Sequence, residues 1–239
     1  MSLTPQDRTD RAKRSTTVKY SPDIAPKELY DEVARGIASN VKMGPFTATS
    51  GVILPYYLNA STNFLDKDVS PKIVELMGHY VDKIIKPVLP VSEEPSLCVG
   101  MEVAGGMLVC QLASAKNSNL NNSLDFVYVR KTRKSTGTAQ QLEGPQKYTS
   151  RTSDSPVINA LWVDDALSTG SSMLEGIVML KEDYNINVVA ALYLVDRTKD
   201  RQNLDDAKQY LAREGFDEVK IFSIYDLQDI DDVVKSNKQ

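Results

Sequence analysis

Two adjacent carboxylates, Asp164 and Asp165, follow an apolar run at residues 160–163 and precede a short loop rich in serine, threonine and glycine. Apolar residues then recur at helical spacing. This order predicts a buried strand, a charged strand end, a tight loop and a helix N-terminus. In an open α/β sheet, ligands bind beyond the carboxyl ends of the strands. Backbone N–H groups at a helix N-terminus bind anions, whereas ionised carboxylates accept hydrogen bonds from hydroxyls or hold a metal. A ligand with hydroxyls beside a phosphate, such as a sugar phosphate, fits both parts.

Residues 160–172 resemble the phosphoribosyl diphosphate (PRPP) motif of type I phosphoribosyltransferases at nearly every position. The resemblance implies that Asp164 and Asp165 hold the 2′- and 3′-hydroxyls of the ribose and take part in catalysis. It also implies that the loop holds the 5′-phosphate through Ser168, Thr169, Gly170, Ser171 and Ser172. The alternative for the acidic pair alone is a strand that ends in solvated acids.

A second strand, glycine loop and helix are predicted around residues 96–113, and glycines allow the backbone to approach a diphosphate closely. In the family this corner is the diphosphate loop, which implies that Glu102 and Gly105 contact PRPP.

Four of the five residues at 130–134 are cations, and the chain then shows no apolar period until about residue 157. A solvated basic run is one interpretation, and a flap that closes over diphosphate is the other. The run resembles the flexible R-K-x-x-K loop of the family. That resemblance implies that Arg130, Lys131 and Lys134 bind PRPP, that the two lysines act in catalysis with Arg133 as reinforcement, and that the flap completes the partner's site in a homodimer.

Residues 43–61 predict two short strands with a turn at Ser50 and Gly51. They resemble the N-terminal hood of orotate phosphoribosyltransferases, which implies that Tyr57 and Leu58 lie against the base. Ser168 is a further base-contact candidate. Arg197 is another, because the resemblance matches it to the Asp-Arg pair that follows the fourth strand of those enzymes, and a guanidinium suits a carboxylate. Without the resemblance, the hairpin is a packing element and Arg197 belongs to a surface ion pair.

The sequence departs from the family at three informative places. Ile53 and Ala104 stand where lysines are usual, and Ser135 and Thr136 replace an Asp-His pair in the flap. The resemblance implies a Mg²⁺-dependent enzyme that transfers the phosphoribosyl group of PRPP to orotate. The departures keep two alternatives open: transfer to another nucleobase (a purine or uracil), or a catalytically weak regulator that binds PRPP or a nucleotide.

The whole chain has 239 residues, is 41% hydrophobic and carries a net charge of −4. These values predict one α/β domain with a parallel sheet of about five strands and helices on both faces. We expect a loose arm at residues 1–22 and a single domain at residues 23–239, with hood elements at about 40–65 and the flap at about 131–157. The charge gives no support for a nucleic-acid partner, and no apolar run is long enough to span a membrane. Cys98 and Cys110 are interpreted as reduced core cysteines of a cytoplasmic protein.

Overall fold

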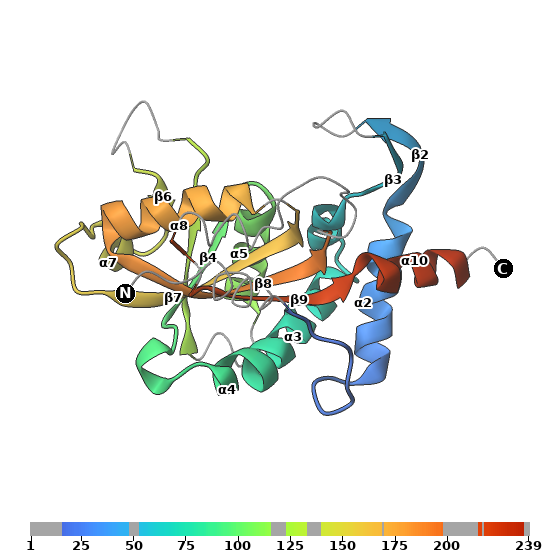
Figure 1. Cartoon of the computed structure of the whole chain (residues 1–239), viewed down its shortest axis with the longest axis horizontal. Coiled ribbons are helices and arrows are strands. Elements are labelled where there is room, and N and C mark those ends of the chain that lie inside the picture. The colour runs from blue at the N-terminus through green and yellow to red at the C-terminus, as the bar shows by residue number, and fades with distance from the viewer. Residues whose placement is uncertain are drawn as a thin grey trace, which may run out of the picture.

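The computed structural model describes residues 16–47, 53–115, 123–132, 140–168, 170–197, 215–216 and 218–236. A seven-stranded sheet in the order β1-β9-β8-β7-β4-β5-β6 forms its centre (Figure 1). The strands are β1 (Thr16–Thr17), β4 (Leu97–Met101), β5 (Asp125–Val129), β6 (Leu142–Glu143), β7 (Ile158–Leu167), β8 (Ile186–Asp196) and β9 (Lys220–Asp226). The five long strands run parallel, as predicted; β1 adds a parallel edge and β6 an antiparallel one.

Helices cover both faces of the sheet, also as predicted. On one face lie α2 (Lys27–Ser39), α3 (Ser70–Tyr80), α5 (Ala104–Ser114) and α10 (Leu227–Ser236), and on the other lie α7 (Gln146–Thr149) and α8 (Ser171–Tyr184). Short helical turns η1 (Ala60–Leu65), η2 (Val81–Ile85), α4 (Lys86–Val88) and η3 (Val91–Glu93) complete the described helices. In Figure 1, α8 lies on the opposite side of the sheet from α3 and α4.

The alternation of β7 shows why both faces must be covered. Leu161 and Val163 face the core under α2, α3 and α5, whereas Trp162 faces the core under α8. Trp162 is fully buried, and a Cβ added at Gly176 of α8 would come within 2.4 Å of its ring. The absence of a side chain at this glycine therefore lets α8 lie directly on the sheet.

The hood is a separate two-stranded antiparallel sheet of β2 (Val41–Thr47) and β3 (Ile53–Leu58). It stands at one end of the molecule beyond α2 (Figure 1). The pairing shifts between Met43 and Phe46, and the rings of Phe46 and Tyr57 lie 5.8 Å apart. The turn predicted at Ser50 and Gly51 lies outside the described residues.

The chain differs from the sequence-based expectation near its N-terminus. Residues 16–22 were assigned to a loose arm, but β1 pairs with β9, and Lys19 lies 3.0 Å from the buried Asp226 carboxylate. Asp226 and Asp229 exchange backbone-to-side-chain hydrogen bonds of 2.9 and 3.1 Å, which caps α10 in the manner of a capping box. The N-terminal segment is thus tied to the end of the last strand.

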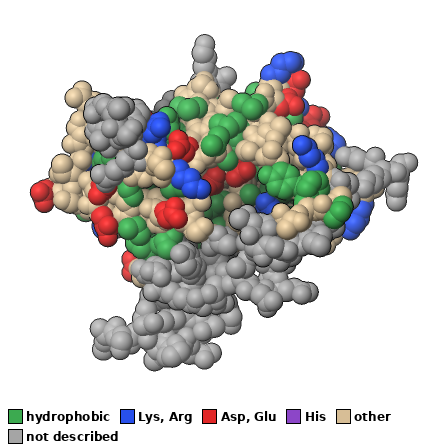
Figure 2. Space-filling model, turned by 90° about the horizontal axis from the view of Figure 1, so that it is seen from above, with side chains coloured by type: hydrophobic (Ala, Val, Ile, Leu, Met, Phe, Trp, Pro, Cys, Tyr) green, Lys and Arg blue, Asp and Glu red, His purple; other side chains and the backbone are tan. Residues whose placement is uncertain are grey.

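Two further expectations change. Cys98 is buried in β4, but Cys110 lies on the exposed side of α5 and is not a core residue. The proposed flap is not structureless throughout, because β6 and α7 lie within it. Among the described residues, no helix combines the length and apolar character needed to cross a bilayer. On the face drawn in Figure 2, basic and acidic side chains of the described residues are intermixed.

Candidate active site

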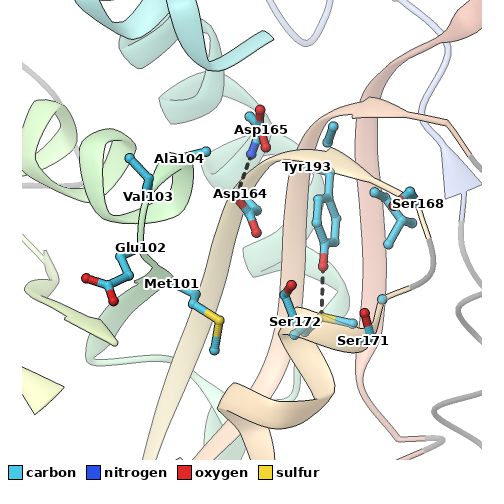
Figure 3. Close-up of a pocket in the computed structure, with 14 residues that line it drawn as sticks. Met101, Glu102, Val103, Ala104, Asp164, Asp165, Ser168, Ser171, Ser172 and Tyr193 are labelled. Atoms are coloured by element: carbon cyan, nitrogen blue, oxygen red, sulfur yellow. Dashed lines mark hydrogen bonds between the residues drawn. The ribbon is translucent and has the colours of Figure 1, made fainter. Parts of the chain in front are cut away.

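The candidate site lies where the connections of the sheet change direction. From β4 the chain crosses by α5, on one face, to β5; from β7 it crosses by α8, on the other face, to β8. A crevice between neighbouring strands of this kind is where open α/β sheets bind ligands. A pocket of about 240 Å³ opens there. It is lined by Met101, Glu102, Val103, Ala104, Asp164, Asp165, Ala166, Leu167, Ser168, Gly170, Ser171, Ser172, Met173 and Tyr193 (Figure 3).

The acidic pair does not end its strand. Pairing between β4 and β7 stops at Val99 and Trp162, whereas pairing between β7 and β8 continues to Leu167 and Asp196. The acids therefore lie on a section of β7 beyond its last β4 pair. The Oδ1 atom of Asp164 accepts the backbone N–H of Asp165 at 3.0 Å, which satisfies a donor on that edge (Figure 3).

Burial dominates the electrostatics of the pair. It raises the pKa of Asp164 to about 8, and the neighbouring Asp165 carboxylate adds to the rise. The pKa of Asp165 is also raised by burial, but the backbone N–H of Ala166 and the charge of Arg197 act in the opposite direction. The pocket therefore favours ligands that bring hydroxyl donors or a cation to these carboxylates.

The loop after β7 has the geometry of an anion site. Gly170 adopts a left-handed conformation with φ of 75° and leads directly into Ser171, the first residue of the 14-residue α8. The first N–H groups of a helix have no partner within it, and the helix dipole favours negative charge there. Ser168, Gly170, Ser171 and Ser172 all line the pocket; Thr169 lies outside the described residues.

The glycine loop after β4 lies against the acidic strand. A Cβ at Gly105 would meet the Val163 carbonyl oxygen at 3.0 Å and Asp164 Oδ1 at 3.2 Å. Gly105 does not itself line the pocket, but its lack of a side chain brings α5 up to the acids. Ala104, at the usual lysine position, does line the pocket. The peptide bond between Glu102 and Val103 is cis.

Arg130 and Lys131, the two described cations at the start of the flap, do not line the pocket. Arg130 Nη1 lies 3.7 Å from Glu143 Oε1 on β6, and the Arg130 backbone N–H donates to the Gln141 carbonyl at 2.8 Å. Lys131 is exposed, and its backbone N–H donates to Glu102 Oε1 at 2.7 Å. Arg133, Lys134, Ser135 and Thr136 lie outside the described residues.

Of the four base-contact candidates, Ser168 lines the pocket, whereas Tyr57, Leu58 and Arg197 do not. Tyr57 is 42% exposed, whereas Leu58 is 3% exposed and packs in the core, so only the tyrosine of this pair presents its ring to solvent. Arg197 follows β8 directly, and its backbone N–H donates to the Leu167 carbonyl at 2.8 Å. Its Nε atom is buried and has no hydrogen-bond partner among the described residues.

Comparison with known proteins points to one family. No family model matches the chain. The orotate phosphoribosyltransferase of Bifidobacterium longum (strain DJO10A) is 28% identical over 194 residues, which cover 79% of this chain and 79% of that protein. The crystal structure of orotate phosphoribosyltransferase from Aeropyrum pernix has a TM-score of 0.60 and 25% identity, covering 87% of this chain and 99% of that chain. The crystal structure of orotate phosphoribosyltransferase from Mycobacterium tuberculosis H37Rv has a TM-score of 0.62 and 22% identity, covering 84% of this chain and 98% of that chain. At this identity the match supports the fold alone.

The chain is thus similar, in sequence and in fold, to orotate phosphoribosyltransferases, which are type I phosphoribosyltransferases. The acidic strand, the serine-rich loop and the glycine loop converge on one pocket. Arg130, Lys131 and the described residues of the hood do not line that pocket.

Sequence reasoning missed several residues of this pocket, above all Tyr193. Its ring is 2% exposed, and its hydroxyl donates to Met173 Sδ at 3.2 Å beneath the first turn of α8 (Figure 3). Burial raises its pKa well above 10, so the hydroxyl stays protonated. The one available signal was an aromatic residue inside the otherwise aliphatic run of residues 188–195.

Proposed function

We propose that this protein transfers the 5-phosphoribosyl group from PRPP to orotate, giving orotidine 5′-monophosphate and diphosphate. The observation that carries the proposal is the single pocket in which an acidic pair, a helix N-terminus and a glycine loop meet. PRPP has one part for each of these features: its ribose hydroxyls match the acidic pair, its 5′-phosphate matches the helix N-terminus, and its diphosphate matches the glycine loop. The relatives named orotate phosphoribosyltransferase supply the choice of base.

The residues support this reaction mainly through charge. The bond from the anomeric carbon to diphosphate breaks as the ring nitrogen of the base forms a new bond to that carbon. Positive charge builds on the ribose and negative charge on the leaving group. Asp164 and Asp165 hold the ribose hydroxyls next to the developing positive charge, and the start of α8 fixes the 5′-phosphate. Preorganised groups of this kind are usually the largest source of rate enhancement.

Mg²⁺ fits the acidic pair. Two neighbouring carboxylates, one with a pKa raised to about 8, gain from a nearby cation, and their oxygens are ligands that Mg²⁺ prefers. Among the described residues there is no group of three or more side chains that could hold a metal ion, so PRPP would supply most of the oxygen ligands. Bound Mg²⁺ neutralises charge on the diphosphate.

Arg197 is the proposed partner of the orotate carboxylate. Its buried Nε donor lacks a partner among the described residues, and its charge lowers the pKa of Asp165, which supports a role close to the acidic pair. Ser168 and the exposed ring of Tyr57 are the further base contacts in the proposal. Leu58 was a candidate as well, but its burial weighs against direct contact.

The leaving diphosphate would be held by Arg130, Lys131 and Lys134 in a homodimer in which each flap completes the partner's site. Arg130 and Lys131 lie outside the pocket lining, which accords with a site that this chain does not complete alone. The cytoplasmic location expected from the sequence stays a prediction.

The test is an assay with PRPP, Mg²⁺ and one base at a time: orotate, uracil, adenine or hypoxanthine. We expect diphosphate release with orotate only. Release with another base and not with orotate would refute the choice of orotate. Tight PRPP binding without release would support a regulator instead, the alternative that Ala104 favours because it lines the pocket where a lysine is usual.

A further inference from the structure

Glu102 makes a contact that its assignment as a PRPP ligand does not explain. It follows β4 directly, and its backbone N–H donates to the Val129 carbonyl at 2.8 Å, which extends the β4–β5 pairing by one residue. Its carboxylate then accepts the backbone N–H of Lys131, 29 residues away in sequence, at 2.7 Å. Glu102 therefore holds the chain on both sides of Arg130.

The charge of Glu102 argues against direct contact with the diphosphate of PRPP. An ionised carboxylate has acceptors only, and diphosphate is an anion without donors, so the two repel each other. In Figure 3 the Glu102 carboxylate points away from Asp164 although the residue lines the same pocket. A carboxylate bound to a backbone N–H forms one of the stronger hydrogen bonds in proteins. The geometry thus gives this side chain a specific partner at the start of the proposed flap.

We propose that Glu102 is a positioning residue, which fixes the backbone of Lys131 at the edge of the diphosphate loop and acts on PRPP through that lysine. The inference rests on the proposed function. Because the Lys131 backbone is held beside Glu102 while its side chain is exposed, the ammonium group is free to turn toward a bound anion. Glutamate supplies the acceptor, and its charge is not needed for binding.

The experiment compares Glu102→Ala with Glu102→Gln, since both remove the charge but only glutamine keeps an acceptor oxygen. Each is made in the wild-type protein and in a Lys131→Ala background, which keeps the backbone N–H but lacks the ammonium. Binding of PRPP with Mg²⁺ is measured by calorimetry, and hydrogen exchange of the Lys131 amide is measured by NMR. We expect the alanine variant to bind about 3- to 10-fold more weakly than the glutamine variant. This ratio should fall to about one in the Lys131→Ala background, as in a double-mutant cycle.

The Lys131 amide should exchange faster in Glu102→Ala than in Glu102→Gln. Glu93→Ala is the matched control, because Glu93 is a half-buried carboxylate that pairs with Lys220 at 3.1 Å and does not line the pocket. It should leave PRPP affinity unchanged. Equal affinity of the alanine and glutamine variants, or the same ratio in both backgrounds, would overturn the inference. A wild-type protein that does not bind PRPP would refute the proposed function itself.

Discussion

Replacing Asp164 by asparagine keeps an oxygen for the backbone N–H of Asp165, 3.0 Å away, but removes the negative charge. In the folded protein the pKa of Asp164 is raised from 3.8 to about 8, chiefly by burial. The folded state therefore binds a proton more tightly than the unfolded state. Stability falls as the pH rises from about 4 to about 8, and above that it no longer changes on account of this group.

A pKa rise from 3.8 to about 8 corresponds to about 6 kcal/mol, at about 1.4 kcal/mol for each pH unit. Relaxation and water reduce this value in the real protein, so we expect Asp164→Asn to be at least about 2 kcal/mol more stable than wild type at pH 8.5. For a chain of this length that is a rise in Tm of about 4–8 °C. The difference should shrink as the pH falls and be smallest near pH 4.

Thermal unfolding without ligand, followed between pH 4 and pH 9, measures the effect. Asp165→Asn is the matched control. Its pKa is also raised by burial, but Arg197 lowers it, so this variant loses a favourable charge contact and should gain less stability. An Asp164→Asn variant that is stabilised equally at pH 4.5 and pH 8.5, or that is less stable than wild type at pH 8.5, would contradict the reasoning. The same variant should bind PRPP more weakly.

Three further predictions concern other parts of the molecule. Arg197→Ala should raise KM for orotate by about 10-fold or more and KM for PRPP much less, because it removes a charged partner of the base carboxylate; steady-state kinetics with each substrate varied in turn measures both. Gly105→Ala should weaken PRPP binding and lower the free energy of unfolding by about 1–3 kcal/mol, because the added Cβ would meet a backbone oxygen of β7 at 3.0 Å. Gly106→Ala is the control: its added Cβ would have its nearest atoms at 3.5 Å, so the PRPP affinity measured by calorimetry should change little. Tyr225→Phe should lose about 1–2 kcal/mol in urea unfolding, because the buried hydroxyl donates to the Tyr30 carbonyl at 2.6 Å.

Local patterns predicted the parts of the fold that repeat over a full element. Leu29, Val33 and Ile37 recur every four residues, and all three are buried on one side of α2. The five long strands were likewise predicted from their apolar runs. The acids and the serine loop could be predicted because they belong to one local strand, loop and helix. This local order brings them to the same sheet edge without any contribution from distant residues.

Elements that depend on distant partners were not predictable in this way. The strand β1 has two residues, too few to show a period, and forms because β9 offers an edge about 200 residues away. The strand β6 is equally short and depends on Tyr128 and Val129 of β5. Cys110 lies in a helix with apolar residues on several sides, so its position alone did not tell which side faces the sheet.

The burial of Asp164 is the feature of the site that most needed the structure. An apolar run followed by two acids is equally compatible with a solvated strand end, where neither pKa would rise. The outcome depends on the neighbours: β8 pairs with β7 as far as Asp196, whereas the last β4 pair is at Val99. The acids are therefore held inside the sheet edge, under α5, before any ligand arrives. Burial of the ionised Asp164 carboxylate lowers the stability of the free protein. Ligand hydroxyls or a cation that contact this carboxylate offset the same cost of burial. Affinity for such a ligand and instability at alkaline pH thus have one physical cause, and Asp164→Asn should change both together.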